Sequence, residues 1–169
     1  MSEITKKICM VGDFGVGKTS LIRRFVERQF SDRYLSTVGV KISRKTVTPP
    51  GPDPHAVKLL IWDLEGKTKF KAIAPSYLQG SSGVLVVADA TRIETIRGLA
   101  QHMQDFTAVN PDGYIAVAFN KVDLIDPEAQ PILEKQLSVT SDRIVATHWT
   151  SAKTGANVDL LFETLAGVL

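Results

Sequence analysis

Short apolar runs alternate with longer stretches of helical spacing along most of the chain. The run Val84-Leu85-Val86-Val87-Ala88 is continuous, as is typical of a strand covered on both faces. After residue 17, Leu21, Ile22, Phe25 and Val26 recur on one face of a predicted helix. Strands are predicted at 7–11, 40–47, 56–64, 83–90, 114–119 and 144–149, and further helices at 95–109, 127–139 and 158–168.

One connection departs from the alternation of strand and helix. Residues 48–54 carry four prolines and a glycine, and prolines cannot donate in the interior of a sheet. The segment is therefore a turn, and the strands at 40–47 and 56–64 form an antiparallel hairpin. Residues 29–39 are predicted to be an exposed loop, and 66–79 an irregular helix or loop.

This order predicts an α/β fold built on an open, mostly parallel sheet. We expect six strands with one antiparallel edge strand from the hairpin, and about five helices on both faces. The 169 residues suit a single domain, 1–169. In such sheets a ligand binds at the carboxyl ends of the strands.

Composition narrows the class of protein. A net charge of +2 is too small to indicate a nucleic-acid partner. Cys9 is the one cysteine, so no internal disulfide is possible, and no apolar run approaches the ~18 residues of a membrane span. Because there is also no signal region, a cytoplasmic protein is expected.

The stretch Gly12-Asp13-Phe14-Gly15-Val16-Gly17-Lys18-Thr19 follows the first predicted strand and opens the first helix. Two glycines five apart, followed by Lys and Thr, are the signature of a P-loop in its required context. Its backbone N–H groups would surround phosphates, Lys18 would meet the β- and γ-phosphates, and Thr19 would bind Mg²⁺. The alternative is a glycine-rich turn with an ordinary lysine.

Three further polar motifs also follow predicted strands. Asp63-Leu64-Glu65-Gly66 could hold a water of the Mg²⁺ shell and bring an N–H to the γ-phosphate, although a plain turn explains it as well. Within 120–123, the Asp123 carboxylate could accept from two N–H groups of guanine, which adenine lacks, while helix capping is the alternative. In 151–153 a backbone N–H could meet the guanine carbonyl.

With these motifs in this order, the chain resembles the Ras-like small GTPases, and the Rab-type branch most closely. The resemblance implies the P-loop NTPase three-layer fold, and the cofactors GTP/GDP and Mg²⁺. It places Mg²⁺ at Thr19, Thr37 and Asp63, and catalysis at Lys18, Thr37 and Lys67. The nucleotide contacts implied are Asp13, Phe14, Gly15, Val16, Gly17, Lys18, Thr19, Ser20, Phe30, Tyr34, Thr37, Gly66, Asn120, Lys121, Asp123, Ser151, Ala152 and Lys153.

By the same resemblance, two switch loops would order around the γ-phosphate and bind effector, exchange-factor or activating proteins. Ile42, Trp62 and Tyr77 occupy the positions of the branch's Phe-Trp-Tyr effector cluster, so the partners are expected to differ. A monomer is expected. The lipidated tail is not seen, so either a tail is missing from this chain or lipid does not anchor the protein.

Two departures from the family pattern bear on hydrolysis. Lys67 stands where a glutamine orients the attacking water, and an ammonium has no acceptor with which to do so. Phe14 replaces a small residue beside the γ-phosphate, where it would obstruct an arginine finger, unless its ring packs sideways on the second switch. Glu65 could supply the missing acceptor, or pair with Lys67 or Lys69.

The sequence therefore favours a GTP-binding molecular switch with slow hydrolysis. Two alternatives stay open: an interaction module that holds GTP without hydrolysing it, and a P-loop ATPase or kinase. The three histidines, His55, His102 and His148, have no ligand-like spacing, and surface or core positions are expected for them.

Overall fold

A single mixed sheet organises the computed structural model, which describes residues 3–33, 37–66, 73–137 and 139–169. Within these residues the strand order is β2-β3-β1-β4-β5-β6, with β2 antiparallel to β3 and every other pairing parallel. The strands are β1 (Glu3–Gly12), β2 (Val40–Val47), β3 (Ala56–Leu64), β4 (Gly83–Asp89), β5 (Tyr114–Asn120) and β6 (Ile144–Trp149). This confirms the predicted α/β class and the antiparallel edge hairpin.

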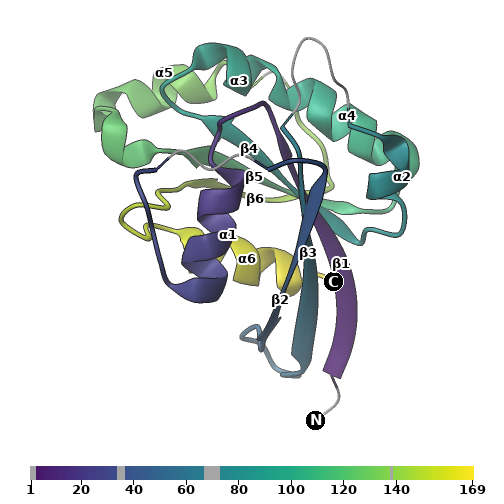
Figure 1. Cartoon of the computed structure of the whole chain (residues 1–169). Helices are drawn as coiled ribbons and strands as arrows, with labels where there is room; N and C mark the ends of the chain where they lie inside the picture. Colours follow the sequence, from purple (N-terminus) through teal and green to yellow (C-terminus); the bar gives the residue numbers. More distant parts are fainter. Residues whose placement is uncertain (1–2, 34–36, 67–72, 138) are drawn as a thin grey trace.

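Helices lie in the connections between strands other than the β2–β3 turn, and α6 follows β6 (Figure 1). They are α1 (Lys18–Glu27), α2 (Pro75–Leu78), α3 (Ile93–Arg97), α4 (Leu99–Val109), α5 (Gln130–Glu134) and α6 (Val158–Ala166), with 3-10 turns η1 (Val122–Leu124) and η2 (Pro127–Ala129). No helix in the described ranges is long and apolar enough to cross a membrane.

Two predicted helices are wrong in their extent. The segment 95–109 is divided between α3 and α4, with Gly98 at the junction. Glycine has little helical preference, and the two helices pack against β4 separately. In place of one helix at 127–139, the chain forms η2 and a five-residue α5. Pro131 lies in the first turn of α5 and lacks the N–H that would join α5 to η2 in one continuous helix.

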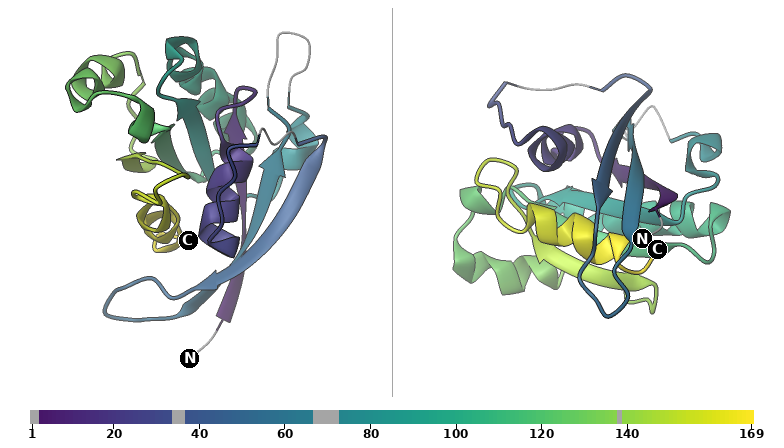
Figure 2. Two further views of the ribbon diagram at one scale, coloured as in Figure 1. Left: turned by 60° about the vertical axis from the view of Figure 1, so that its left-hand side comes forward. Right: turned by 90° about the horizontal axis from the view of Figure 1, so that it is seen from below.

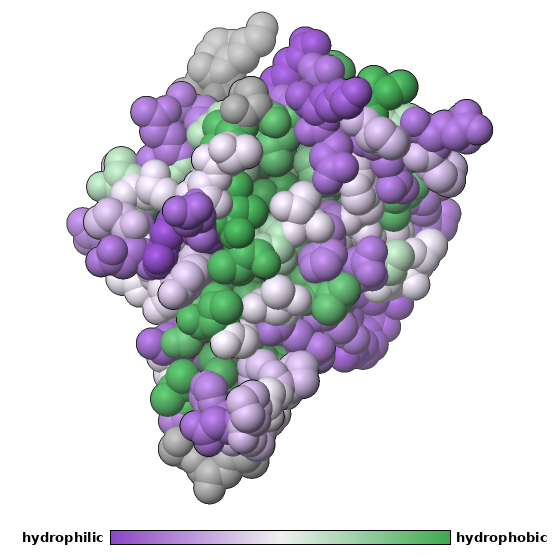
Figure 3. All heavy atoms as spheres, turned by 180° about the vertical axis from the view of Figure 1, so that it is seen from behind, coloured by the Kyte–Doolittle hydropathy of each residue, from purple (hydrophilic) through white to green (hydrophobic). Residues whose placement is uncertain are grey.

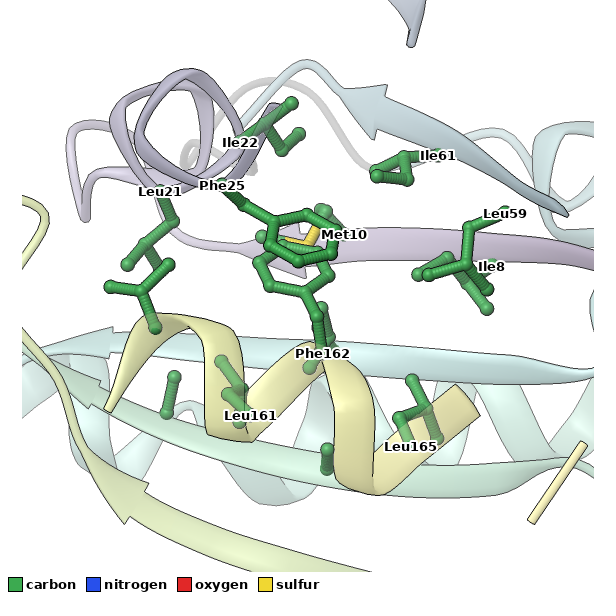
Figure 4. Close-up of a cluster of buried hydrophobic side chains, with 14 of the residues drawn as sticks. Ile8, Met10, Leu21, Ile22, Phe25, Leu59, Ile61, Leu161, Phe162 and Leu165 are labelled. Carbon is green, nitrogen blue, oxygen red and sulfur yellow. The ribbon is translucent and has the colours of Figure 1, made fainter. Parts of the chain in front are cut away.

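Helices cover both faces of the sheet. α1 and α6 lie together on one face, where Phe25 and Phe162 stack with ring centroids 4.0 Å apart (Figure 4). α2, α3 and α4 cover the other face, and their core includes Cys9, Ile96 and Phe106. Cys9 is fully buried and unpaired, as its place in the first strand predicts.

The β2–β3 hairpin extends beyond the helices (Figure 2). Its far turn contains the proline-rich segment 48–54, which agrees with the sequence. From behind, a band of hydrophobic side chains crosses this side of the molecule between polar areas (Figure 3). Ile42 of β2, which is 40% exposed, pairs with Trp62 of β3.

The parallel strands end at one edge of the sheet, at Gly12, Leu64, Asp89, Asn120 and Trp149. The P-loop motif and the segments 63–66, 120–123 and 151–153 therefore meet there. This edge is the candidate site.

Candidate functional site

The loop between β1 and α1 depends on glycine at two positions. Gly17 has φ of +102°, and a Cβ on it would lie 2.3 Å from Nδ2 of Asn120. Gly12 passes so close to β4 that a Cβ would lie 2.5 Å from the carbonyl oxygen of Val87. The loop is thus held against β4 and β5 and leads directly into α1, whose first N–H groups have no intrahelical partner.

Lys18 is the first residue of α1 and is only 6% exposed. Its ammonium donates to the carbonyl oxygens of Gly12 (3.3 Å) and Asp13 (3.4 Å), inside the loop. Burial lowers the pKa of Lys18 to about 8, although the carboxylates of Asp63 and Asp13 oppose the shift. A buried cation with weak compensation is a favourable partner for an anion such as a phosphate.

Three oxygen-bearing side chains converge beside Lys18. The Thr19 hydroxyl donates to Oδ2 of Asp63 (2.5 Å) and lies 2.6 Å from the Thr37 hydroxyl, which is 3.3 Å from the same Oδ2. Burial raises the pKa of the Asp63 carboxyl, against the hydrogen bonds from these threonines and the charge of Lys18. Its Oδ1 is buried and has no hydrogen-bond partner among the described residues.

This donor set suits Mg²⁺, which prefers oxygen ligands, keeps several waters, and is usually held by one or two carboxylates and the phosphates of a substrate. The orphaned Oδ1 of Asp63 is an acceptor that a metal-bound water would satisfy. No cluster of three or more His, Cys, Asp or Glu side chains suited to a metal occurs in the described ranges. The Thr19–Thr37–Asp63 group is therefore the place where Mg²⁺ fits.

Next to this group lies a cavity of about 300 Å³. Its walls combine the glycine loop, the segment after α1 and the loops that follow β5 and β6. They are Gly15, Gly17, Ser20, Phe30, Ser31, Asp32, Arg33, Asn120, Lys121, Asp123, Leu124, Ala152 and Lys153.

The loops after β5 and β6 are joined to the glycine loop and to each other. Asn120, which is 1% exposed, donates to the carbonyl of Val16 (3.0 Å) and accepts from the Thr150 hydroxyl (3.1 Å). Asp123 accepts from the Ser151 hydroxyl (2.8 Å) through Oδ1. The cavity thus has a phosphate-type loop at one end and a carboxylate at the other.

Several predicted contact residues lie outside the cavity walls. Val16 is fully buried in the core beneath the loop, and Ser151 is buried behind Asp123. The Asp13 carboxylate points to α4, where it lies 2.8 Å from Nε2 of His102. Tyr34 and Lys67 lie outside the described residues.

The two expected switch segments approach the glycine loop and each other. A Cβ on Gly66 would lie 2.6 Å from the Cα of Phe14, so only glycine fits this approach. Phe14 itself is 45% exposed. Glu65 donates its N–H to the Gly39 carbonyl (2.8 Å), and its carboxylate accepts from the Gly39 N–H (3.3 Å).

Sequence reasoning missed a charged group beneath the loop. The Asp89 carboxylate accepts from Lys121 (2.8 Å) and Arg92 (3.2 Å), and Arg92 also donates to the Phe14 carbonyl (2.7 Å). Burial would raise the pKa of Asp89, but hydrogen bonds from Lys121 and Thr91 outweigh it and lower the pKa. Asp89 is the one charged residue in the strand predicted at 83–90 and lies next to its end, which was the available signal.

His102 was also missed, since it was expected to have no role. It is 2% exposed, its Nε2 pairs with Asp13, and its Nδ1 is buried without a partner in the described part of the chain. The contact joins residues 89 positions apart, so no spacing in the sequence could have indicated it.

Comparison with known proteins identifies the family of the chain. A family model described as the Ras family matches residues 7–169. The Ras-related protein Rab-22A of Homo sapiens is 37% identical over 158 residues, which cover 92% of this chain and 79% of that protein. The Ras-related protein Rab-31 of Mus musculus is 35% identical over 159 residues (93% and 79%), and the GTP-binding protein ypt5 of Schizosaccharomyces pombe 33% over 164 residues (96% and 77%).

Proposed function

The chain belongs to the Ras family of small GTPases, and on this premise we propose that it is a switch that binds GTP and GDP with Mg²⁺ and hydrolyses GTP slowly. Membership of the family and its GTP-binding character are shown by the match over residues 7–169. The Mg²⁺ dependence, the slow rate and the residue roles are the proposal.

The observation that carries it is the composition of the cavity. One set of walls presents the glycine loop, inside which Lys18 is buried, and the other presents Asp123 together with Ala152 and Lys153. The first suits phosphates. The second pairs an acceptor with backbone donors, which matches the N–H groups and carbonyl of guanine and leaves a carboxylate unpaired with adenine.

Separate residues of the chain are proposed to bind the phosphates, to hold Mg²⁺ and to respond to the γ-phosphate. The loop amides and Lys18 bind the phosphates and stabilise the charge that develops when water attacks the γ-phosphoryl group in line. Thr19, Thr37 and the Asp63 carboxylate would hold Mg²⁺, whose chemistry is to neutralise charge on the β- and γ-phosphates. Thr37 and Gly66 belong to the switch segments that the γ-phosphate would order.

Hydrolysis is proposed to be slow because the residue that follows Gly66 cannot accept a hydrogen bond from the attacking water. Lys67 has three donors and no acceptor. The Glu65 carboxylate, which could have supplied one, accepts from the Gly39 N–H. Phe14 keeps a partly exposed ring on the glycine loop, where it would hinder the arginine of an activating protein.

Two measurements on the purified full chain test the proposal. Mass spectrometry of the released nucleotide is expected to give GDP or GTP, and ATP or ADP would instead support a P-loop ATPase or kinase. Single-turnover hydrolysis is then expected to be slow but measurable, and the double variant Phe14→Gly with Lys67→Gln is expected to be faster. No gain in the double variant would mean that these two departures do not limit turnover.

A GTP-binding module without turnover is the second candidate, favoured by the same Phe14 and by the engaged Glu65 carboxylate. A single-turnover hydrolysis rate equal to that of free GTP in buffer would establish this second candidate.

The protein is proposed to be a monomer. Its proposed partners are effectors, exchange factors or activating proteins that bind at the switch loops. The side chains considered for this contact begin with Ile42 and Trp62, which are direct neighbours across β2 and β3. Trp62 and Tyr77 pack against the same core on one face of the sheet. A cytoplasmic location is proposed, with membrane recruitment through a partner or a lipidated tail. Fractionation of cells that express the full-length protein tests this.

A further inference from the structure

Arg24 connects α1 to the loop that follows β6. Its Nε donates to the carbonyl of Ala152 (2.7 Å) and its Nη2 to the carbonyl of Lys153 (2.5 Å). Both contacts span more than 125 residues of sequence. Arg24 is not in the cavity wall, whereas Ala152 and Lys153 are.

The first contact orients a peptide group. In the trans peptide between Ala152 and Lys153, the C=O and the N–H point in opposite directions. Because Arg24 holds the C=O on the side of α1, the N–H of Lys153 points away from Arg24. In the described part of the chain, the N–H groups of Ala152 and Lys153 have no hydrogen-bond partner, so both stay available to a ligand.

The second contact reaches the carboxylate. The peptide whose C=O is held by Nη2 carries the N–H of Thr154, which donates to the Ser151 hydroxyl (3.0 Å). That hydroxyl in turn donates to Oδ1 of Asp123 (2.8 Å). One guanidinium therefore supports both groups that would contact the base, the backbone donors and the Asp123 carboxylate.

A fork of this kind suits arginine. The guanidinium is planar and keeps its charge, so it can hold two carbonyls at once, and hydrogen bonds from a charged donor are stronger than neutral ones. Arg24 also lies about 1.7 helix turns after Lys18, the residue that would meet the phosphates, so both are on the same rigid element.

We propose that Arg24 is a positioning residue for guanine recognition, which holds the 151–153 loop in the form that reads the 6-carbonyl and supports Asp123. The inference rests on the proposed function, because it assumes a guanine nucleotide in the cavity. Arg24 then controls how long GDP stays bound and how strongly the site selects guanine over other bases.

The test measures GDP dissociation from the purified full chain with a fluorescent GDP analogue. Arg24→Ala is expected to raise the dissociation rate about 10- to 100-fold, the range for one lost bond from a charged donor, because the contact with the Lys153 carbonyl is exposed to water and counts for little. Arg24→Lys keeps the charge but not the fork, so an intermediate rate is expected, and it serves if the alanine variant does not fold. Arg28→Ala is the matched control: Arg28 caps the same helix and pairs with exposed Asp159 (2.6 Å), away from the base loop.

A second nucleotide separates positioning from simple support of the fold. 2-Aminopurine riboside 5′-diphosphate keeps the ribose, the phosphates and the 2-amino group but lacks the 6-oxygen and, with it, the N1–H. If Arg24 positions the donors for that oxygen, Arg24→Ala weakens GDP several-fold more than this analogue. Equal weakening of both nucleotides, a wild-type rate in the variants, or the same change in Arg28→Ala would overturn the inference. If the unmodified protein itself prefers adenine nucleotides, the proposed function fails, and this inference fails with it.

Discussion

The side-chain amide of Asn120 connects the glycine loop to the loop after β6, and its removal should lower the free energy of unfolding substantially. Asn120 closes β5 and is 1% exposed. It donates to the carbonyl of Val16 and accepts from the Thr150 hydroxyl, so it joins the glycine loop to the loop after β6. Asn120→Ala would leave both groups buried without their partner.

The magnitude follows from those two groups. An unsatisfied buried donor or acceptor costs about 1–3 kcal/mol, so the variant should lose about 2–6 kcal/mol of unfolding free energy. For a chain of this size, each kcal/mol lowers Tm by about 2–4 °C, which gives a fall of roughly 5–20 °C. Nucleotide affinity is expected to fall as well, because Asn120 holds the carbonyl of Val16, and the next residue, Gly17, lines the cavity.

Urea unfolding of nucleotide-free protein measures the loss without a contribution from the ligand. Thr150→Val supplies the control, since it removes one of the two bonds and adds no polar group. In a double-mutant cycle, the combined loss should be smaller than the sum of the single losses, because both variants break the same contact. A loss below about 0.5 kcal/mol in Asn120→Ala, the range of ordinary surface substitutions, would refute the reasoning.

Three other substitutions test separate parts of the site. Asp89→Asn should lower the unfolding free energy by about 1–3 kcal/mol at pH 7, because it leaves the Lys121 ammonium poorly compensated. The pKa of Asp89 is lowered in the folded state, so its stabilising contribution is present above about pH 4 and is lost as the pH falls through that folded pKa. Urea unfolding should therefore show that the difference in stability between the variant and the wild type becomes smaller in acid. Asp63→Asn should remove most of the acceleration of GDP release that EDTA causes in the wild type, and an unchanged response would place Mg²⁺ elsewhere. Gly66→Ala would bring a Cβ within 2.6 Å of the Cα of Phe14, so the affinity ratio of a non-hydrolysable GTP analogue to GDP should fall about tenfold by titration calorimetry, whereas an unchanged ratio would mean that the close approach is not used with ligand bound.

Much of the architecture was readable in advance because it depends on local patterns. The continuous apolar run of β4 and the prolines at 48–54 predict a covered strand and a hairpin turn from the chemistry of adjacent residues. The errors arose where neighbouring elements decide the outcome. Gly98 divides a helix whose apolar periodicity continues across it, because α3 and α4 each pack on the sheet separately. Pro131 separates η2 from α5, because it has no N–H with which to continue a helix across that junction.

The site shows the same division. Residue type and order alone determine a phosphate loop, because glycine is required at Gly12 and Gly17 and a cation at Lys18, and these needs are met within eight consecutive positions. The Asp63 and Asp123 motifs could be placed near it, since the ends of parallel strands meet at one edge.

What only the tertiary structure decided is which distant side chains support these motifs. Arg24 at Ala152 and Lys153, and His102 at Asp13, join residues about 90 to 130 positions apart, and neither contact leaves a periodic or compositional mark. A motif specifies the groups that touch a ligand because their chemistry must match it. The groups that hold a motif in place need only reach it, so many residues at many positions could serve, and packing selects among them.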